Sequence, residues 1–132
     1  ALKEHALQTN IHAASRASVL ELIVENDTAF KRALDAYKYP ERYPSKTQNQ
    51  HRADGEVFMQ KLENLLQVNR YLFGDTLSLA DIAIFPFVRQ FAAVDATWFE
   101  VAPYPKLQDW LKGMVESKLF ISIMEKQPTY IT

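Results

Sequence analysis

Apolar residues recur at helical spacing along most of the chain, and the clearest pattern lies at Thr76–Gln90. This stretch reads TLSLADIAIFPFVRQ, and every residue from Ile82 to Val88 is apolar. Such a run is typical of a buried helix, although a buried strand would give the same pattern. The start signal of this stretch favours a helix. We expect a kink at Pro86, because proline lacks the N–H that would bond to the carbonyl of Ile82.

Ser78 and Asp81 supply that start signal. Their spacing is that of a capping box, with Asp in place of the usual Glu or Gln. The Ser78 hydroxyl is expected to accept from the Asp81 N–H, and the Asp81 carboxylate from the Ser78 N–H. Because a cap accounts for both residues, we interpret them as structural rather than catalytic.

A second capping box, from Ser18 to Glu21, predicts a long helix that runs to about Lys38. One face of this helix carries apolar residues at helical spacing, namely Val19, Ile23, Phe30, Leu34 and Tyr37. We expect this face to pack against the rest of the domain.

Asn26 lies on the same face, between Ile23 and Phe30. An unpaired buried amide costs about 1–3 kcal/mol. Either Asn26 bonds a backbone group of a neighbouring helix, or this face borders a cleft, and we favour the first interpretation. Alternatively, Asp27 caps a second helix and the first one breaks near Asn26.

Two prolines within Tyr37–Pro44 are expected to end this helix. The next helix is predicted over Ser45–Phe73, with Gly74 as the residue after its end. Gly55 lies inside it, and a glycine there usually marks the close approach of another backbone.

The last third of the chain predicts an irregular connection over Asp95–Tyr104, then a helix that begins at Pro105. Ser117 is expected to cap a short last helix with Leu119, Phe120, Ile123 and Met124 inside. The fold class predicted from these patterns is all-α, a bundle of about five or six helices around one buried central helix.

The totals of the sequence exclude several kinds of function. The 132 residues fit one domain, and the net charge of −1 argues against nucleic acid or an acidic membrane surface as a partner. The chain has no cysteine, which excludes disulfides, thiolate metal sites and a cysteine nucleophile. Its longest apolar run is too short to span a bilayer. We expect a cytoplasmic protein without a membrane partner.

Side chains that carry chemistry are sparse. His5, His12 and His51 have no second ligand at metal-binding spacing, so no metal site is predicted. Lys61 and Glu63 have the pattern of solvated surface charges. We find no constellation for acid–base or nucleophilic catalysis and predict no catalytic residue in this chain.

The first residues lack a helix start signal. Ala1–Leu7 already has a helical pattern, and Gln8–Ala17 is polar and weakly patterned. We expect residues 1–17 to be the tail of a preceding domain and a linker, and residues 18–132 to form the helical domain. The alternative is a chain that begins here after removal of an initiator methionine.

Two stretches resemble the C-terminal helical domain of the glutathione S-transferase superfamily. They are RYLFGDTLSLADIAIFPFVRQF, Arg70–Phe91, and YPKLQDWLKGMVESKLF, Tyr104–Phe120. Asn26–Tyr43 is similar to a bacterial branch of that family. In the family, the capping box before the apolar helix is a folding signature, and here it corresponds to Ser78 and Asp81.

The resemblance implies the substrate-side half of a two-domain transferase. The family's other half is an N-terminal thioredoxin-like domain with the glutathione-binding loop, the cis-proline and the catalytic residue, and none of these is found in the sequence. Glutathione would be the co-substrate of the parent protein, and this chain would need no cofactor. The first long helix would line the site of a small electrophilic substrate, which points to Asn26, Phe30 and Tyr37.

A non-catalytic protein is the alternative. Similar helical domains serve as assembly modules in translation factors, aminoacyl-tRNA synthetases and stress-response regulators. The resemblance also implies a possible homodimer. Whether the parent protein is an enzyme stays open at this point, and we favour the transferase.

Overall fold

The computed structural model describes residues 16–117, which form a helical bundle. Residues 16–25 are helical, and the elements that follow are η1 (Asn26–Phe30), α2 (Lys31–Lys38), η2 (Pro40–Arg42), α3 (Gln48–Val68), α4 (Leu79–Val94), α5 (Ala96–Val101) and α6 (Pro105–Val115). Within 16–117 the only β-type pairing is an isolated bridge between Tyr71 and Gly74. The predicted all-α fold is confirmed.

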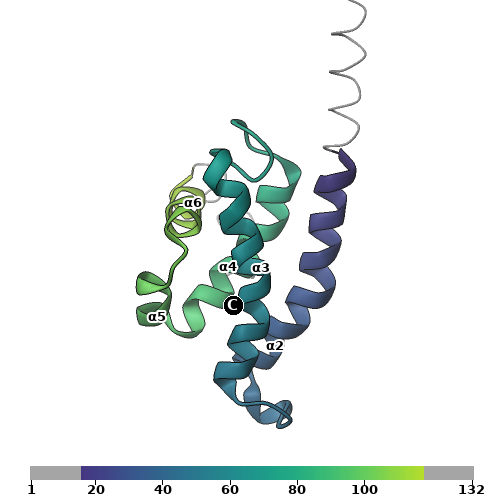
Figure 1. The fold of residues 1–132 in the computed structure, drawn as a ribbon, viewed down its shortest axis with the longest axis vertical. Coiled ribbons are helices and arrows are strands. Elements are labelled where there is room, and N and C mark those ends of the chain that lie inside the picture. Colours follow the sequence, from purple (N-terminus) through teal and green to yellow (C-terminus); the bar gives the residue numbers. More distant parts are fainter. Residues whose placement is uncertain (1–15, 118–132) are drawn as a thin grey trace, which may run out of the picture.

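The helices pack around a core between α3, α4 and α6. Residues 16–25 continue through η1 into α2 as one long rod along one side of the molecule, and α5 and α6 lie on the opposite side (Figure 1). Contacts join α2 to α3 and α4, and α6 to α3 and α4. The N-terminal rod and α6 therefore share the same two central helices.

The first rod differs in two ways from the prediction. Residues 16 and 17 are already helical, so Ser18 lies inside the helix and does not cap it. The chain does not break near Asn26 either, because Asp27 lies within the π-helical turn η1, which leads directly into α2. The expected last helix, after Ser117, falls outside the described residues.

The π turn explains how four inward residues share one side of the rod. Leu22, Asn26, Phe30 and Leu34 follow one another at a spacing of four and are all buried. In a regular α-helix such a series drifts around the axis, because one turn holds 3.6 residues. A π turn is wider and counters this drift. The inward side of the rod therefore carries Leu22, Asn26, Phe30 and Leu34. Ile23, which the sequence predicts on the inward face, is only partly buried.

Helix α3 is shorter than predicted at both ends. It begins after Thr47, whose hydroxyl accepts from Gln50 N at 3.2 Å while the Gln50 side chain accepts from Thr47 N at 2.8 Å. It ends at Val68 rather than Phe73. The residues that follow form a turn in which Tyr71 N donates to Gly74 O at 2.9 Å. Gly74 has φ 149°, so it serves this turn and does not end the helix.

Gly55 marks a close approach, as its position in α3 predicts. The neighbour is the ring of Phe91 rather than a backbone: a Cβ placed on Gly55 would lie 2.5 Å from Phe91 Cε2. Real Cβ atoms do not come that near to another carbon. The glycine therefore lets α3 and α4 pack closely around a buried phenylalanine.

The connection after α4 contains a short helix where an irregular segment is predicted. Asp95 begins α5, because its carboxylate accepts from Trp98 N at 3.0 Å. Pro105 is the first residue of α6, as expected. Leu107, Trp110, Leu111 and Met114 are its buried residues.

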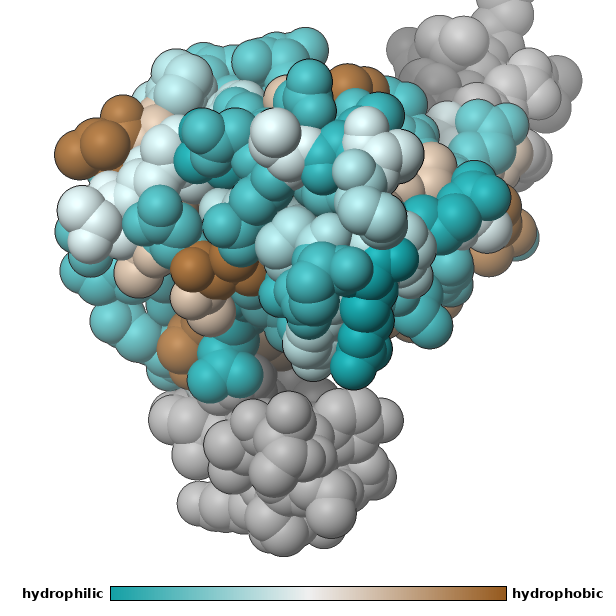
Figure 2. Space-filling view, turned by 90° about the horizontal axis from the view of Figure 1, so that it is seen from below, coloured by the Kyte–Doolittle hydropathy of each residue, from teal (hydrophilic) through white to brown (hydrophobic). Residues whose placement is uncertain are grey.

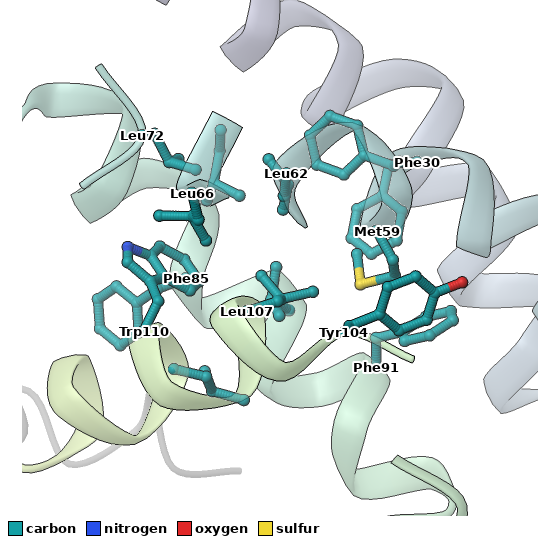
Figure 3. Packing of buried hydrophobic residues seen from close by; sticks show 14 of the residues in the cluster. Phe30, Met59, Leu62, Leu66, Leu72, Phe85, Phe91, Tyr104, Leu107 and Trp110 are labelled. Carbon is teal, nitrogen blue, oxygen red and sulfur yellow. The ribbon is translucent and has the colours of Figure 1, made fainter. Parts of the chain in front are cut away.

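The core is a single cluster that receives side chains from every major helix (Figure 3). Figure 3 shows Leu62 and Met59 of α3 between Phe30 on one side and Leu107 of α6 on the other. Helix α4 contributes Ile84, Phe85, Val88 and Phe91, although Ile82 and Phe87 stay partly exposed. The face in Figure 2 is mainly hydrophilic, with its hydrophobic residues in small separate groups.

Candidate functional site

Asp81 lies at the centre of a buried hydrogen-bond network at the start of α4. Its side chain is fully buried. Oδ2 accepts from Ser78 N at 2.9 Å and from Ser78 Oγ at 2.7 Å, and Ser78 caps α4 by accepting from Asp81 N. Oδ1 accepts from Leu72 N at 3.0 Å and from Trp110 Nε1 at 2.9 Å. The carboxylate thus anchors α4 to α6 and to the turn after α3.

Four donors occupy this carboxylate, which is as many as its lone pairs accommodate. No lone pair is left to take a proton from a substrate. The arrangement supports the structural interpretation of Ser78 and Asp81.

Glu63 is a second buried anchor, and its prediction as a solvated surface charge is wrong. Its side chain is 2% exposed. The carboxylate accepts from Leu107 N at 2.9 Å and from Lys106 N at 3.3 Å, and Gln67 donates to it as well. The N–H groups of Lys106 and Leu107 have no partner within α6, because they lie at its N-terminus, where a negative charge is favoured. Glu63 of α3 therefore caps a helix that lies more than forty residues further along the chain.

The three residues predicted to contact a substrate lie in the core. Asn26 is 0% exposed, and Phe30 and Tyr37 are each 2% exposed. The Phe30 ring stacks on Phe58 at 4.8 Å between centroids, and Phe91 contacts both Phe30 and Tyr37, at 5.6 and 4.9 Å. The structure therefore joins Phe30 and Tyr37 through one aromatic cluster. Direct contact with a substrate stays a prediction.

Asn26 does not bond a backbone group of a neighbouring helix within the described range. Its Nδ2 donates to the carboxylate of Asp27 at 3.1 Å, and its Oδ1 is buried without a partner among residues 16–117. This buried oxygen lies in the π turn, and turns of this kind occur frequently at functional sites.

A polar cluster that the sequence did not reveal surrounds Arg52, next to the aromatic cluster of Phe30, Phe91 and Tyr37. We call it the arginine cluster, and its members are Tyr37, Arg52, Glu56, Trp98 and Tyr104. The Arg52 guanidinium lies 4.2 Å from the centre of the Trp98 ring, and its Nε is 3.8 Å from Glu56 Oε2. The Tyr104 hydroxyl donates to Glu56 Oε1 at 2.7 Å. Residues from α2, α3 and α5 thus meet here.

The two tyrosines of this cluster remain protonated at neutral pH. Burial raises the pKa of Tyr37, and the neighbouring Arg52 charge opposes part of that rise. The pKa of Tyr104 is also raised, first by burial and then by its hydrogen bond to the Glu56 carboxylate. Both phenols can donate hydrogen bonds, and neither has the lowered pKa that a tyrosinate nucleophile or base requires.

Within residues 16–117 no group of His, Asp and Glu side chains is arranged to hold a metal ion. The ring of His51 is buried, with Nε2 2.8 Å from the carbonyl oxygen of Tyr43. His5 and His12 fall outside the described range. In the same range, no helix is both long enough and apolar enough to cross a bilayer.

Comparison with known proteins identifies the family of this helical bundle. The family described as glutathione S-transferase, C-terminal domain, matches residues 48–113, which run from the first residue of α3 into α6 and make up half of the 132 residues. The chain belongs to this family. Searches of curated proteins and of solved structures gave no match.

The matched residues include most of the anchors described above. Glu63, Ser78, Asp81 and Trp110 all lie within 48–113. The capping box alone was evident from the sequence, because both its members are local. Glu63 and Trp110 gave no such signal, since their partners are distant along the chain.

Proposed function

We propose that this chain is the substrate-side helical domain of a glutathione S-transferase-like protein. The match to the C-terminal domain family over α3, α4, α5 and most of α6 carries the proposal. In the parent protein, a thioredoxin-like domain would bind glutathione and hold the catalytic residue, in keeping with the family resemblance. The helical domain would contribute one wall of the site for the electrophile.

The reaction of the parent would join the glutathione sulfur to an electrophilic carbon. The thiolate attacks that carbon, the new S–C bond forms, and a leaving group departs with the electron pair of the broken bond. With an aryl halide the leaving group is a halide ion. The helical domain takes no part in making or breaking these bonds. Its contribution is to bind and orient the apolar part of the substrate.

The first rod is the wall that we assign to the substrate. Asn26, Phe30 and Tyr37 lie on its inward face, enclosed by α3 and α4, so under this proposal they support the substrate wall from inside the domain. Under this proposal the stacked rings of Phe30 and Phe58 hold the wall rigid from beneath. The electrophile itself is a small molecule with an apolar body.

We also propose a cytoplasmic homodimer as the state of the parent protein. Leu20 and Val24 lie one helical turn apart, and each is 59% exposed. This apolar surface supports contact with a second subunit or with the proposed thioredoxin-like domain. Neither nucleic acid nor a membrane is proposed as a partner, since the net charge is −1.

Conjugation assays test this proposal. The chain of 132 residues, mixed with glutathione and a chromogenic aryl halide, should give no rate above that of the uncatalysed reaction. The parent protein, with its thioredoxin-like domain attached, should conjugate the halide. An inactive parent that still binds other proteins through its helical domain would favour the assembly module instead.

A further inference from the structure

A groove of about 420 Å³ lies between α6 and the turn that follows α3. It shares no lining residue with the arginine cluster or with Asn26 and Phe30. Leu66, Trp110 and Met114 are buried and give it an apolar interior, whereas Arg70 and Lys106 are exposed at its edge. Its size lies in the range of small-molecule sites, about 300–1,000 Å³.

The two basic residues of the groove have no ion pair among residues 16–117. Arg70 lies beside the ring of Tyr71, 5.5 Å from its centre, and no carboxylate neutralises it there. Lys106 is in the first turn of α6, where the helix dipole disfavours a cation. Among residues 16–117, Asp109 is the only acidic residue that lines the groove, so the described lining, with Arg70 and Lys106, carries a net charge of +1. The placement of Lys106 does not help α6 to fold.

Gly113 lines the same groove without a packing reason. It lies inside α6, where glycine is the poorest helix former after proline. A Cβ added there would meet no atom within 4 Å. Gly55 differs in this respect, since the Phe91 ring excludes a side chain from that position. The glycine at 113 keeps the groove wide at the expense of helix stability.

We propose that this groove binds a small molecule that has an apolar, preferably aromatic, body and one carboxylate. The body lies against Leu66, Trp110 and Met114, and the carboxylate accepts hydrogen bonds from Arg70 and Lys106. This site is separate from the proposed electrophile wall on the first rod, and the inference does not depend on the proposed function.

The two tryptophans of the chain provide a direct test with 2-naphthoate as the probe. Trp110 lines the groove, whereas Trp98 lies in the arginine cluster. In an NMR titration of the whole chain, the indole N–H signal of Trp110 should shift and saturate, and that of Trp98 should stay in place. A Trp98→Phe variant assigns the two signals. The neutral analogue 2-naphthalenemethanol should bind about tenfold more weakly, because it lacks the charge.

Variants separate the site from general effects on the fold. Lys106→Gln and Arg70→Gln should each weaken 2-naphthoate about tenfold. Lys112→Gln is the matched control, because Lys112 is an exposed cation of the same helix that does not line the groove. Gly113→Leu should abolish binding by filling the groove, while its thermal midpoint stays equal to that of the unaltered chain or rises.

Three results would overturn the inference. They are no saturable shift of Trp110 at about 1 mM probe, equal affinity for the neutral analogue, and unchanged binding by Lys106→Gln. If Gly113→Leu fails to fold, Gly113→Ala takes its place and should weaken binding by narrowing the groove.

Discussion

The indole N–H of Trp110 donates to Oδ1 of Asp81 at 2.9 Å, and this bond joins the middle of α6 to the first turn of α4. The same oxygen accepts from Leu72 N, so three segments meet at one carboxylate. Asp81, which completes the capping box of α4, thereby also fixes the positions of α6 and of the turn after α3.

Loss of this carboxylate should cost far more than loss of an ordinary cap. Asp81→Ala leaves the buried donors of Leu72 and Trp110 without an acceptor, and we expect it to lower the free energy of unfolding by about 3–5 kcal/mol. Denaturant unfolding measures this loss. The exposed Asp75→Ala is the control and should change the free energy by about 0.5 kcal/mol or less. A loss for Asp81→Ala no larger than that of the control would contradict the anchor.

Removal of the Ser78 hydroxyl should have a smaller effect. Ser78→Ala deletes the cap of α4 and should cost about 1 kcal/mol. Thr47→Ala, which deletes the matching cap of α3, should cost a similar amount. An unchanged denaturation midpoint for Ser78→Ala would show that its hydroxyl does not cap α4.

Glu63→Gln tests the cap that α3 provides to α6. The substitution keeps the size of the side chain but removes the charge beside the N-terminal amides of α6, so we expect a loss of about 1–2 kcal/mol. Lys61→Gln is the control, because it removes only the exposed ion pair with Glu25, which should contribute about 0–1 kcal/mol. Equal small losses for the two variants would mean that the Glu63 charge does not stabilise α6.

Two glycines offer a matched pair for core packing. Gly55→Ala places a Cβ against the Phe91 ring and should destabilise by about 1–3 kcal/mol. Gly113→Ala meets open space and should stabilise by up to about 1 kcal/mol. Thermal and denaturant unfolding of both variants measure these two changes, which should have opposite signs. Phe91→Leu in the Gly55→Ala background should restore part of the loss, and its failure to do so would show that the ring is not the obstacle.

Because the buried side-chain oxygen of Asn26 has no partner among residues 16–117, we expect the protein to tolerate an apolar residue at this position. Asn26→Leu removes an unpartnered polar atom from the core and keeps a similar volume, so we expect a change between zero and about 2 kcal/mol of stabilisation. A clear loss of stability would show that the amide satisfies a buried partner.

The local part of the fold could be predicted from the sequence, and the distant part could not. Ser78 and Asp81 are three residues apart, so the capping box can be recognised from the sequence alone. Asp95 and Thr47 are also local caps, yet they lie in polar stretches where several residues have the same ability to cap a helix. The sequence therefore left the start of α3 and the presence of α5 undetermined.

Glu63 shows why the rest was out of reach. Its neighbours on α3 include Lys61 and Asn64, both exposed, so its surroundings in the sequence are those of a surface charge. Only the packing of α6 against α3 brings the amides of Lys106 and Leu107 to its carboxylate. The arginine cluster is hidden for the same reason, because Tyr37, Arg52 and Trp98 come from three helices.

Calorimetric titration of this chain with glutathione tests the proposed division of labour most directly. If glutathione is held by a separate thioredoxin-like domain, the helical domain alone should release no heat of binding. Saturable binding to the 132-residue chain, lost in an Asn26→Leu variant that remains folded, would show that the helical domain carries its own glutathione site and would contradict the account.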